Sequence, residues 1–170
     1  QTIGNINIGS NTLTSNSGGS AIYVGDVTAG NLSLTTTETG SIIQSTKFKG
    51  GELNLVTNNG NVEVTAMSGD LSIGSLSLGT GTATIEASSG TINDAASDTS
   101  IDFVAGSATL KGTSIGNSQP LEFGTVAALD LTASSGSISA NSAAVSGTSL
   151  TASAGSGTIS FENSTGALEV

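Results

Sequence analysis

The feature that most constrains the fold is a unit of two short alternating segments joined by a turn of small residues. Residues 128–139 show it most clearly, with Gly136 closing the turn. Because successive side chains of a strand point to opposite faces, Leu129, Leu131 and Ile138 fall on one side of the unit and the polar residues on the other. Variants of the unit recur along the chain and predict a repetitive, all-β architecture.

Equivalent apolar positions recur at a spacing of 21 residues. The pairs with this spacing are Leu34 and Leu55, Leu110 and Leu131, Leu129 and Leu150, and Ile138 and Ile159. In the middle of the chain the spacing becomes irregular, with 30 residues from Leu55 to Ile85 and 25 from Ile85 to Leu110. This irregularity predicts either insertions in two coils or a change of register near residues 71–78.

A single repeat has too few apolar residues to bury a face alone, so successive repeats must stack on one another. We therefore predict a single-chain parallel β-helix (a β-solenoid) with coils of about 20 residues, each made of about three short strands and three bends. Gly and Asn would supply the positive φ angles of the bends. An antiparallel β-sandwich is the rival interpretation, since strands every 8–12 residues also describe it.

Composition narrows the range of functions. Only 9% of the residues are charged, and the formal net charge of −10 comes from 13 acidic residues and three lysines. Such a chain lacks the basic residues that nucleic acids and anionic membranes require. It also has no apolar run long enough to span a membrane. Without His, Cys or Arg the usual nucleophile–base pairs cannot form, so we predict neither an enzyme nor a cofactor.

Three acidic residues form the best candidate cluster, Asp94, Asp98 and Asp102. We interpret them first as a solvated acidic loop in an irregular coil. Calcium ligation by carboxylate oxygens and glycoside hydrolysis by paired carboxylates are the alternatives. Because neither a D-x-D-x-D-G loop nor a G-G-x-G-x-D repeat is present, the sequence predicts no metal site and no catalytic residue.

Two further groups of side chains stand out. Lys47 and Lys49 flank Phe48 and are interpreted as outward lysines that protect an edge or loop, with a subunit or polyanion contact as the alternative. The aromatic residues are interpreted as core fillers rather than sugar-stacking platforms; they are Tyr23, Phe103, Phe123 and Phe161. Thr35, Thr57, Thr132 and Thr151 form no sustained ladder that would favour ice binding.

Four segments carry a resemblance to a known family. They are LSLTTTETGSI (32–42), LNLVTNNGNV (53–62), LDLTASSGSI (129–138) and LTASAGSGTI (150–159). Together they resemble the shaft repeats of filamentous-haemagglutinin-type adhesins, large bacterial proteins exported by two-partner secretion. The resemblance implies a right-handed β-helix, a secreted or cell-surface location, and adhesion. Nothing in the chain matches the N-terminal secretion domain of that family.

These observations favour a structural function. Residues 1–170 are predicted to be one β-solenoid segment of a longer array or filament, serving as an adhesive rod of a secreted or cell-surface bacterial protein. Its predicted partners are neighbouring coils or other copies at the open ends, together with host or bacterial surface glycans. The alternative is a carbohydrate-active β-helix enzyme or a carbohydrate-binding module.

Overall fold

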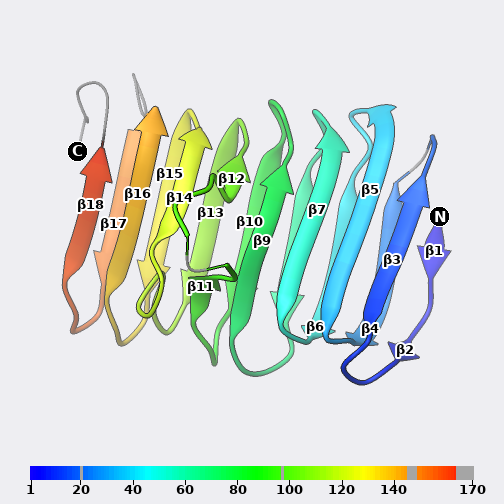
Figure 1. The fold of residues 1–170 in the computed structure, drawn as a ribbon, viewed down its shortest axis with the longest axis horizontal. Coiled ribbons are helices and arrows are strands. Elements are labelled where there is room, and N and C mark those ends of the chain that lie inside the picture. The colour runs from blue at the N-terminus through cyan, green and yellow to red at the C-terminus, as the bar shows by residue number, and fades with distance from the viewer. Residues whose placement is uncertain (20, 97, 145–148, 164–170) are drawn as a thin grey trace.

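The computed structural model describes residues 1–19, 21–96, 98–144 and 149–163, and in these ranges the chain is all-β. Figure 1 shows two sheets lying back to back, with the strands of each sheet side by side along the long axis. Sheet A contains β1 (Thr2–Ile3), β2 (Ile6–Asn7), β4 (Ile22–Thr28), β6 (Ile43–Lys49), β8 (Val62–Ala66), β10 (Thr82–Ala87), β13 (Ser107–Gly112), β15 (Ala128–Ala133) and β17 (Ser149–Ala154). Sheet B contains β3 (Thr12–Ser17), β5 (Asn31–Thr39), β7 (Glu52–Asn58), β9 (Leu71–Ser77), β11 (Ile92–Asp94), β12 (Phe103–Val104), β14 (Leu121–Thr125), β16 (Ile138–Ala144) and β18 (Ile159–Asn163).

Every strand pairing among the described residues is parallel. The chain alternates between the two sheets, so a strand inside a sheet pairs with a strand one coil before it and a strand one coil after it. The result is a β-solenoid of about 7 turns with coils of about 21 residues. The prediction of a parallel solenoid is thus confirmed, and the antiparallel sandwich is excluded.

The regular coils have two long strands and two turns, so the expectation of three short strands was wrong for them. The strands of the regular coils span five to nine residues, long enough to form a whole side of the coil. Inward side chains of the two sheets then meet across one thin layer. With the apolar residues already buried between two faces, the coil has no need of a third.

The 21-residue spacing is confirmed as strand register. Leu34 pairs with Leu55, and Ile138 pairs with Ile159, as expected. Leu110 and Leu131, and Leu129 and Leu150, are also register partners. The interval from Leu55 to Ile85 was misread, because these residues belong to different sheets; Leu55 pairs with Leu76 instead. Ile85 does pair with Leu110, which makes that coil longer by an insertion.

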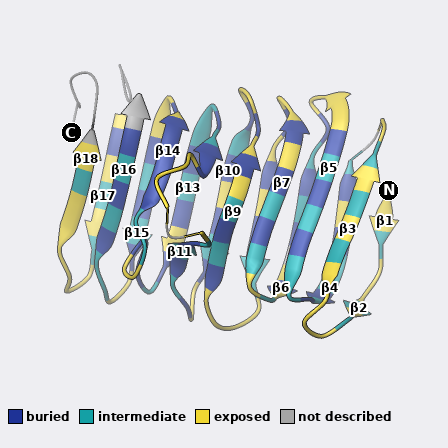
Figure 2. Ribbon diagram, viewed as in Figure 1, coloured by how far each residue is buried: buried dark blue, intermediate teal, exposed yellow. Residues whose placement is uncertain are grey.

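Inward side chains form ladders that make one continuous core (Figure 2). One ladder in sheet A runs through Ile22, Ile43, Val62, Ala83, Ala108, Leu129 and Leu150. In sheet B, Phe103 and Phe123 are buried and stack with their ring centroids 5.0 Å apart. The prediction that these two fill the core is confirmed, and Phe161 packs against it partly buried. The prediction that Tyr23 fills the core was wrong, because its side chain lies on the outer face of β4 and is 43% exposed.

Side-chain acceptors at the turns hold neighbouring coils in register. In each case a side-chain oxygen accepts a hydrogen bond from the backbone N–H 21 residues later. Asn61 Oδ1 accepts from the Thr82 N–H at 2.9 Å, and Asp70 Oδ1 accepts from the Thr91 N–H at 2.8 Å. These bonds satisfy N–H groups at and just before strand starts that would otherwise need water.

Two kinds of turn position restrict the residue type. Asn59 has a φ of 59°, in the left-handed region where Asn and Gly are favoured. Gly60 and Gly81 have no positive φ, but a Cβ on Gly60 would overlap the Ser41 carbonyl oxygen and a Cβ on Gly81 would overlap that of Gly60. Positive φ therefore explains only some of the turn glycines, and the close approach of one coil to the next explains these two. No helix in the described part of the chain is long and apolar enough to cross a membrane.

Candidate functional site

One row of outward-facing side chains on sheet B contains the candidate site. The row continues from coil to coil as Ser33, Asn54, Ser75, Asp102, Glu122, Asn141 and Glu162. Phe103 and Phe123 follow Asp102 and Glu122 in the chain and point into the core. Strand alternation therefore places the two carboxyl groups side by side on the outer face, on successive rungs.

The two carboxyl groups are buried although they belong to an outward row. Asp102 is 4% exposed and Glu122 is 7% exposed, whereas Ser75 on the preceding rung is exposed. The cover is formed by residues 98–101, which precede β12 and cross the outer face of sheet B (Figures 1 and 2). We call residues 98–101 the strap.

The strap arises from an insertion in one coil. β11 pairs with the first half of β9, where Asp94 is opposite Ile73, and β12 pairs with the second half, where Phe103 is opposite Leu76. The three residue steps from Ile73 to Leu76 therefore lie opposite the nine steps from Asp94 to Phe103 in the next coil. The surplus residues cannot join the ladder and fold over the sheet.

An apolar contact positions the end of the strap. Ile101 is 47% exposed, yet its Cγ2 lies beside Gly124 of β14. A Cβ added to Gly124 would be only 3.0 Å from this Cγ2 atom. The glycine therefore leaves the space in which Ile101 rests.

Asp102 and Glu122 are connected through backbone and side chain. The Glu122 N–H donates to Asp102 Oδ2 at 2.9 Å, and the Asp102 N–H donates to the Glu122 carbonyl oxygen at 2.8 Å. Asn141 Nδ2 donates to Glu122 Oε1 at 3.2 Å. Glu122 Oε2 is buried and accepts no hydrogen bond when both groups are ionised. A proton on Asp102 would supply the missing donor.

The electrostatics favour that proton. Burial, with repulsion from Asp94 and Glu122, raises the pKa of Asp102 from 3.8 to about 8, although the hydrogen bond from the Glu122 N–H opposes the shift. Burial also raises the pKa of Glu122, while its hydrogen bonds with Asp102 and Asn141 act in the opposite direction. Burial and the nearby negative charges therefore both favour the protonated form of this pair.

The structure brings the three predicted acidic residues into one region but gives them different environments. Asp98 is exposed, whereas Asp94 is 4% exposed, so the interpretation of a solvated loop was wrong for Asp94 and Asp102. Asp94 accepts hydrogen bonds from the N–H groups of Ala96 at 2.8 Å and Asp98 at 3.1 Å. Among the described residues, no group of three or more acidic side chains is arranged to hold a metal ion.

Sequence reasoning missed Glu122, which read as one polar position in an ordinary strand. The irregular 25-residue interval was the available signal. It indicates an inserted loop, and a residue opposite such a loop can be covered on its outer face. The register that places Glu122 beside Asp102 depends on an offset of 20 residues between Phe103 and Phe123, which the regular spacing of 21 does not predict.

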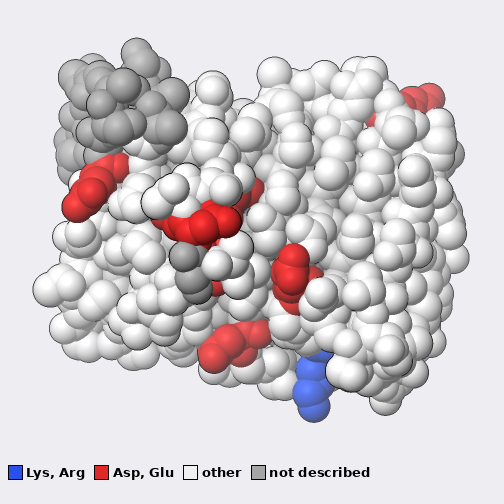
Figure 3. All heavy atoms as spheres, viewed as in Figure 1, with Lys and Arg blue, Asp and Glu red and all other residues white. Residues whose placement is uncertain are grey.

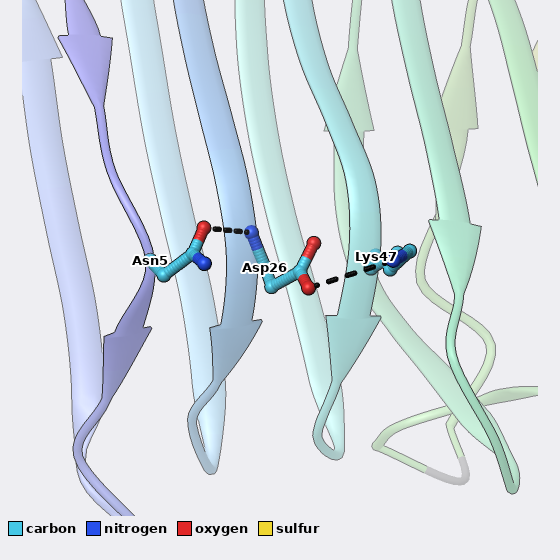
Figure 4. Close-up of polar contacts among 3 residues, drawn as sticks. All are labelled: Asn5, Asp26 and Lys47. Atoms are coloured by element: carbon cyan, nitrogen blue, oxygen red, sulfur yellow. Dashed lines mark hydrogen bonds and ion pairs between the residues drawn. The ribbon is translucent and has the colours of Figure 1, made fainter.

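A second polar contact lies near the N-terminal end of sheet A (Figure 4). Asn5 Oδ1 accepts a hydrogen bond from the Asp26 N–H at 3.1 Å, and Asp26 Oδ2 lies 3.6 Å from Lys47 Nζ. Lys47 and Lys49 do point outward, as predicted, and Phe48 between them is buried. The expectation that they protect an edge or loop was wrong, because β6 is paired on both sides, with β4 and β8. An exposed ion pair of this kind contributes at most about 1 kcal/mol to stability.

Charge is distributed unequally between the two faces. All three lysines of the chain lie on strands of sheet A, at positions 47, 49 and 111. Figure 3 views the sheet B face, where acidic side chains gather around the strap and at other points along the molecule. On sheet A, a hollow of about 110 Å³ is lined by small and polar residues including Ser107, Asp130 and Thr151. It is smaller than pockets that enclose typical small-molecule ligands.

No protein-family model, no curated protein and no solved structure matches this chain. The resemblance to filamentous-haemagglutinin-type shaft repeats therefore stays a prediction.

Proposed function

We propose that this chain is a rod segment of a secreted or cell-surface bacterial adhesin or extracellular filament, and that it acts through length, rigidity and contacts with neighbouring coils. The observation that carries the proposal is the uninterrupted parallel pairing from β1 to β17. Pairing in this direction adds about 4.8 Å of length for each coil. A solenoid of this kind is a suitable spacer because each coil is supported by its neighbours.

The ends of the sheets offer the contacts that would extend such a rod. β1 and β3 each pair on one side only, with β4 and β5. Their inward residues Ile3 and Leu13 pack against the core while partly exposed. An open strand edge is a template for another strand. We propose that a further coil, from the same chain or from another copy, adds at this edge.

The carbohydrate-active alternative receives less support from the geometry. Glycoside hydrolysis requires two carboxyl groups that reach the substrate. Asp102 and Glu122 are neighbours on sheet B, but both are buried beneath the strap. The hollow on sheet A includes no aromatic side chain on which a sugar ring could stack. We therefore retain the mechanical role as the proposal.

The end-stacking prediction can be tested by placing charge on the open edge. Lysine on edge strands opposes strand addition, so we expect Thr14→Lys/Asn16→Lys to reduce end-to-end assembly. The matched control is Ser33→Lys/Thr35→Lys, which adds the same charge at the register partners on β5, where both edges are paired. Sedimentation velocity across a range of concentrations, with negative-stain images of rod length, would measure assembly.

The two variants make the test decisive. We expect the control to assemble like the unmodified protein and the edge variant to remain monomeric. If the unmodified protein is monomeric at every concentration, or both variants assemble equally, stacking between copies at this edge is wrong. Adhesion is tested separately, by binding of fluorescent beads coated with the protein to a glycan array and to epithelial cells; bare-bead levels of binding on both would argue against it.

A further inference from the structure

We propose that Asp102 and Glu122 form a proton-operated latch: the proton they share holds the strap on sheet B, and its loss releases the strap. The inference does not depend on the rod function, since it concerns a local element of one coil. It is carried by the burial of two carboxyl groups on adjacent rungs beneath an inserted segment, with Glu122 Oε2 buried and without a hydrogen-bond donor.

Loss of the proton would leave two negative charges buried side by side. Coulomb repulsion at such short range in a partly desolvated site is strong, and Glu122 Oε2 would have no donor. Water would have to solvate the two charges to reduce this repulsion. Water can reach them if the strap, which covers the pair, moves away. A buried charge without a partner is among the least tolerated features of a folded protein.

The charged groups that face the pair offer no compensation. Asp94 of β11 and Asp98 of the strap both act on Glu122 with negative charge. From the neighbouring strands, Asn141 of β16 and Ser75 of β9 are the register neighbours, and both are uncharged. No lysine contributes, because all three lie on sheet A.

The strap is the part of this coil that can move at the lowest cost. Its hydrogen bonds are local: the Asp98 N–H donates to Asp94 Oδ2 and the Ser100 N–H donates to Asp98 Oδ1. One of its contacts with the sheet is Ile101 against Gly124. By contrast, β12 beyond it is held by ladder hydrogen bonds to β9 and β14. Segments with few buried contacts open before the core does.

The raised pKa of Asp102, about 8, sets the pH window. The folded chain holds the proton below this pKa, whereas an unfolded Asp loses it near pH 4. The protonated, closed state therefore has its full advantage below about pH 4 and loses it as the pH rises through about 8. We expect the strap to be closed at pH 6 and increasingly open at pH 9.

Hydrogen–deuterium exchange measured by mass spectrometry tests the latch. After correction for the intrinsic pH dependence of exchange, we expect opening of peptides covering residues 98–101 to increase roughly a hundredfold between pH 6 and pH 9, because opening releases one proton at every pH up to the Asp102 pKa of about 8. Asp102→Asn keeps both an acceptor for the Glu122 N–H and a donor for Glu122 Oε2 without a titratable proton. It should remain closed at both pH values.

The matched control is Asp70→Asn, since Asp70 also accepts an N–H from the next coil but lies away from the pair. It should keep the response of the unmodified protein. If Asp102→Asn does not fold, Glu122→Gln replaces it, and carbon-13 NMR titration of the Asp102 carboxyl in the unmodified protein gives the pKa directly. An unchanged response in the folded variant, no opening at pH 9 in the unmodified protein, or an ordinary Asp102 pKa would overturn the proposal.

Discussion

Turn glycines show how single residues limit the stacking of coils. Gly60 and Gly81 lie one above the other at equivalent turns, where backbone carbonyls approach too closely for a Cβ. The sequence predicts glycine-rich bends, and we expected positive φ angles to be the reason for the glycines. Close approach between coils depends on which turns lie above one another. The sequence does not show this until the register of the strands is known.

We predict that Gly81→Ala destabilises the protein although its φ angle suits any residue. The added methyl group must displace the backbone of the preceding turn, and overpacking of this kind typically costs about 1–3 kcal/mol. Chemical denaturation followed by circular dichroism would measure the change. Gly18→Ala is the control, because a Cβ at Gly18 has nothing within 4 Å; an equal loss in both variants would show that general loss of glycine flexibility, not coil contact, is responsible.

At the level of strands and turns, alternation and hydrogen-bonded acceptors together specify the coil. The alternation of apolar residues in segments such as 129–131 predicts strands and their inward faces, and these are confirmed. The number of strands per coil was not predictable in the same way. Small polar residues near the strand ends, such as Thr57, read as turn residues, yet Thr57 is buried within β7.

We predict that Asn61→Ala weakens the attachment between two coils. The variant removes the acceptor for the Thr82 N–H and leaves that donor to water, which should cost about 1 kcal/mol and lower Tm by about 2–4 °C for a chain of this length. Asn16→Ala, at an exposed position of β3, is the comparison and should melt within a degree of the unmodified protein. Equal melting temperatures for the two variants would contradict the register role of Asn61.

For the whole molecule, the sequence was sufficient to predict a parallel solenoid and its period because both follow from spacing. The candidate site was only half predictable. Asp102 was noticed through its acidic neighbours, whereas its burial and its partner Glu122 follow from an insertion that folds over the sheet. A loop of irregular length has no period, so its path over the surface does not appear in the repeat pattern.

The period itself can be tested by removing one coil. Deleting residues 62–82 joins Asn61 to Ala83, which is the register partner of Val62. We expect this variant to remain folded, with a cooperative thermal transition, since each coil contacts only its neighbours. Deleting residues 62–81 instead places Thr82 at that position and turns every following apolar side chain outward; it should aggregate or lose its β-sheet circular dichroism. Similar behaviour of the two deletions would contradict the register.

The direction of the hydrogen bonds has a mechanical consequence. They run along the long axis, so a force applied between the two ends loads the coils in series, and the weakest interface opens first. Each coil that detaches unwinds about 21 residues, or roughly 70 Å of extended polypeptide. Under tension the molecule would therefore lengthen in discrete steps, as successive coils detach one at a time.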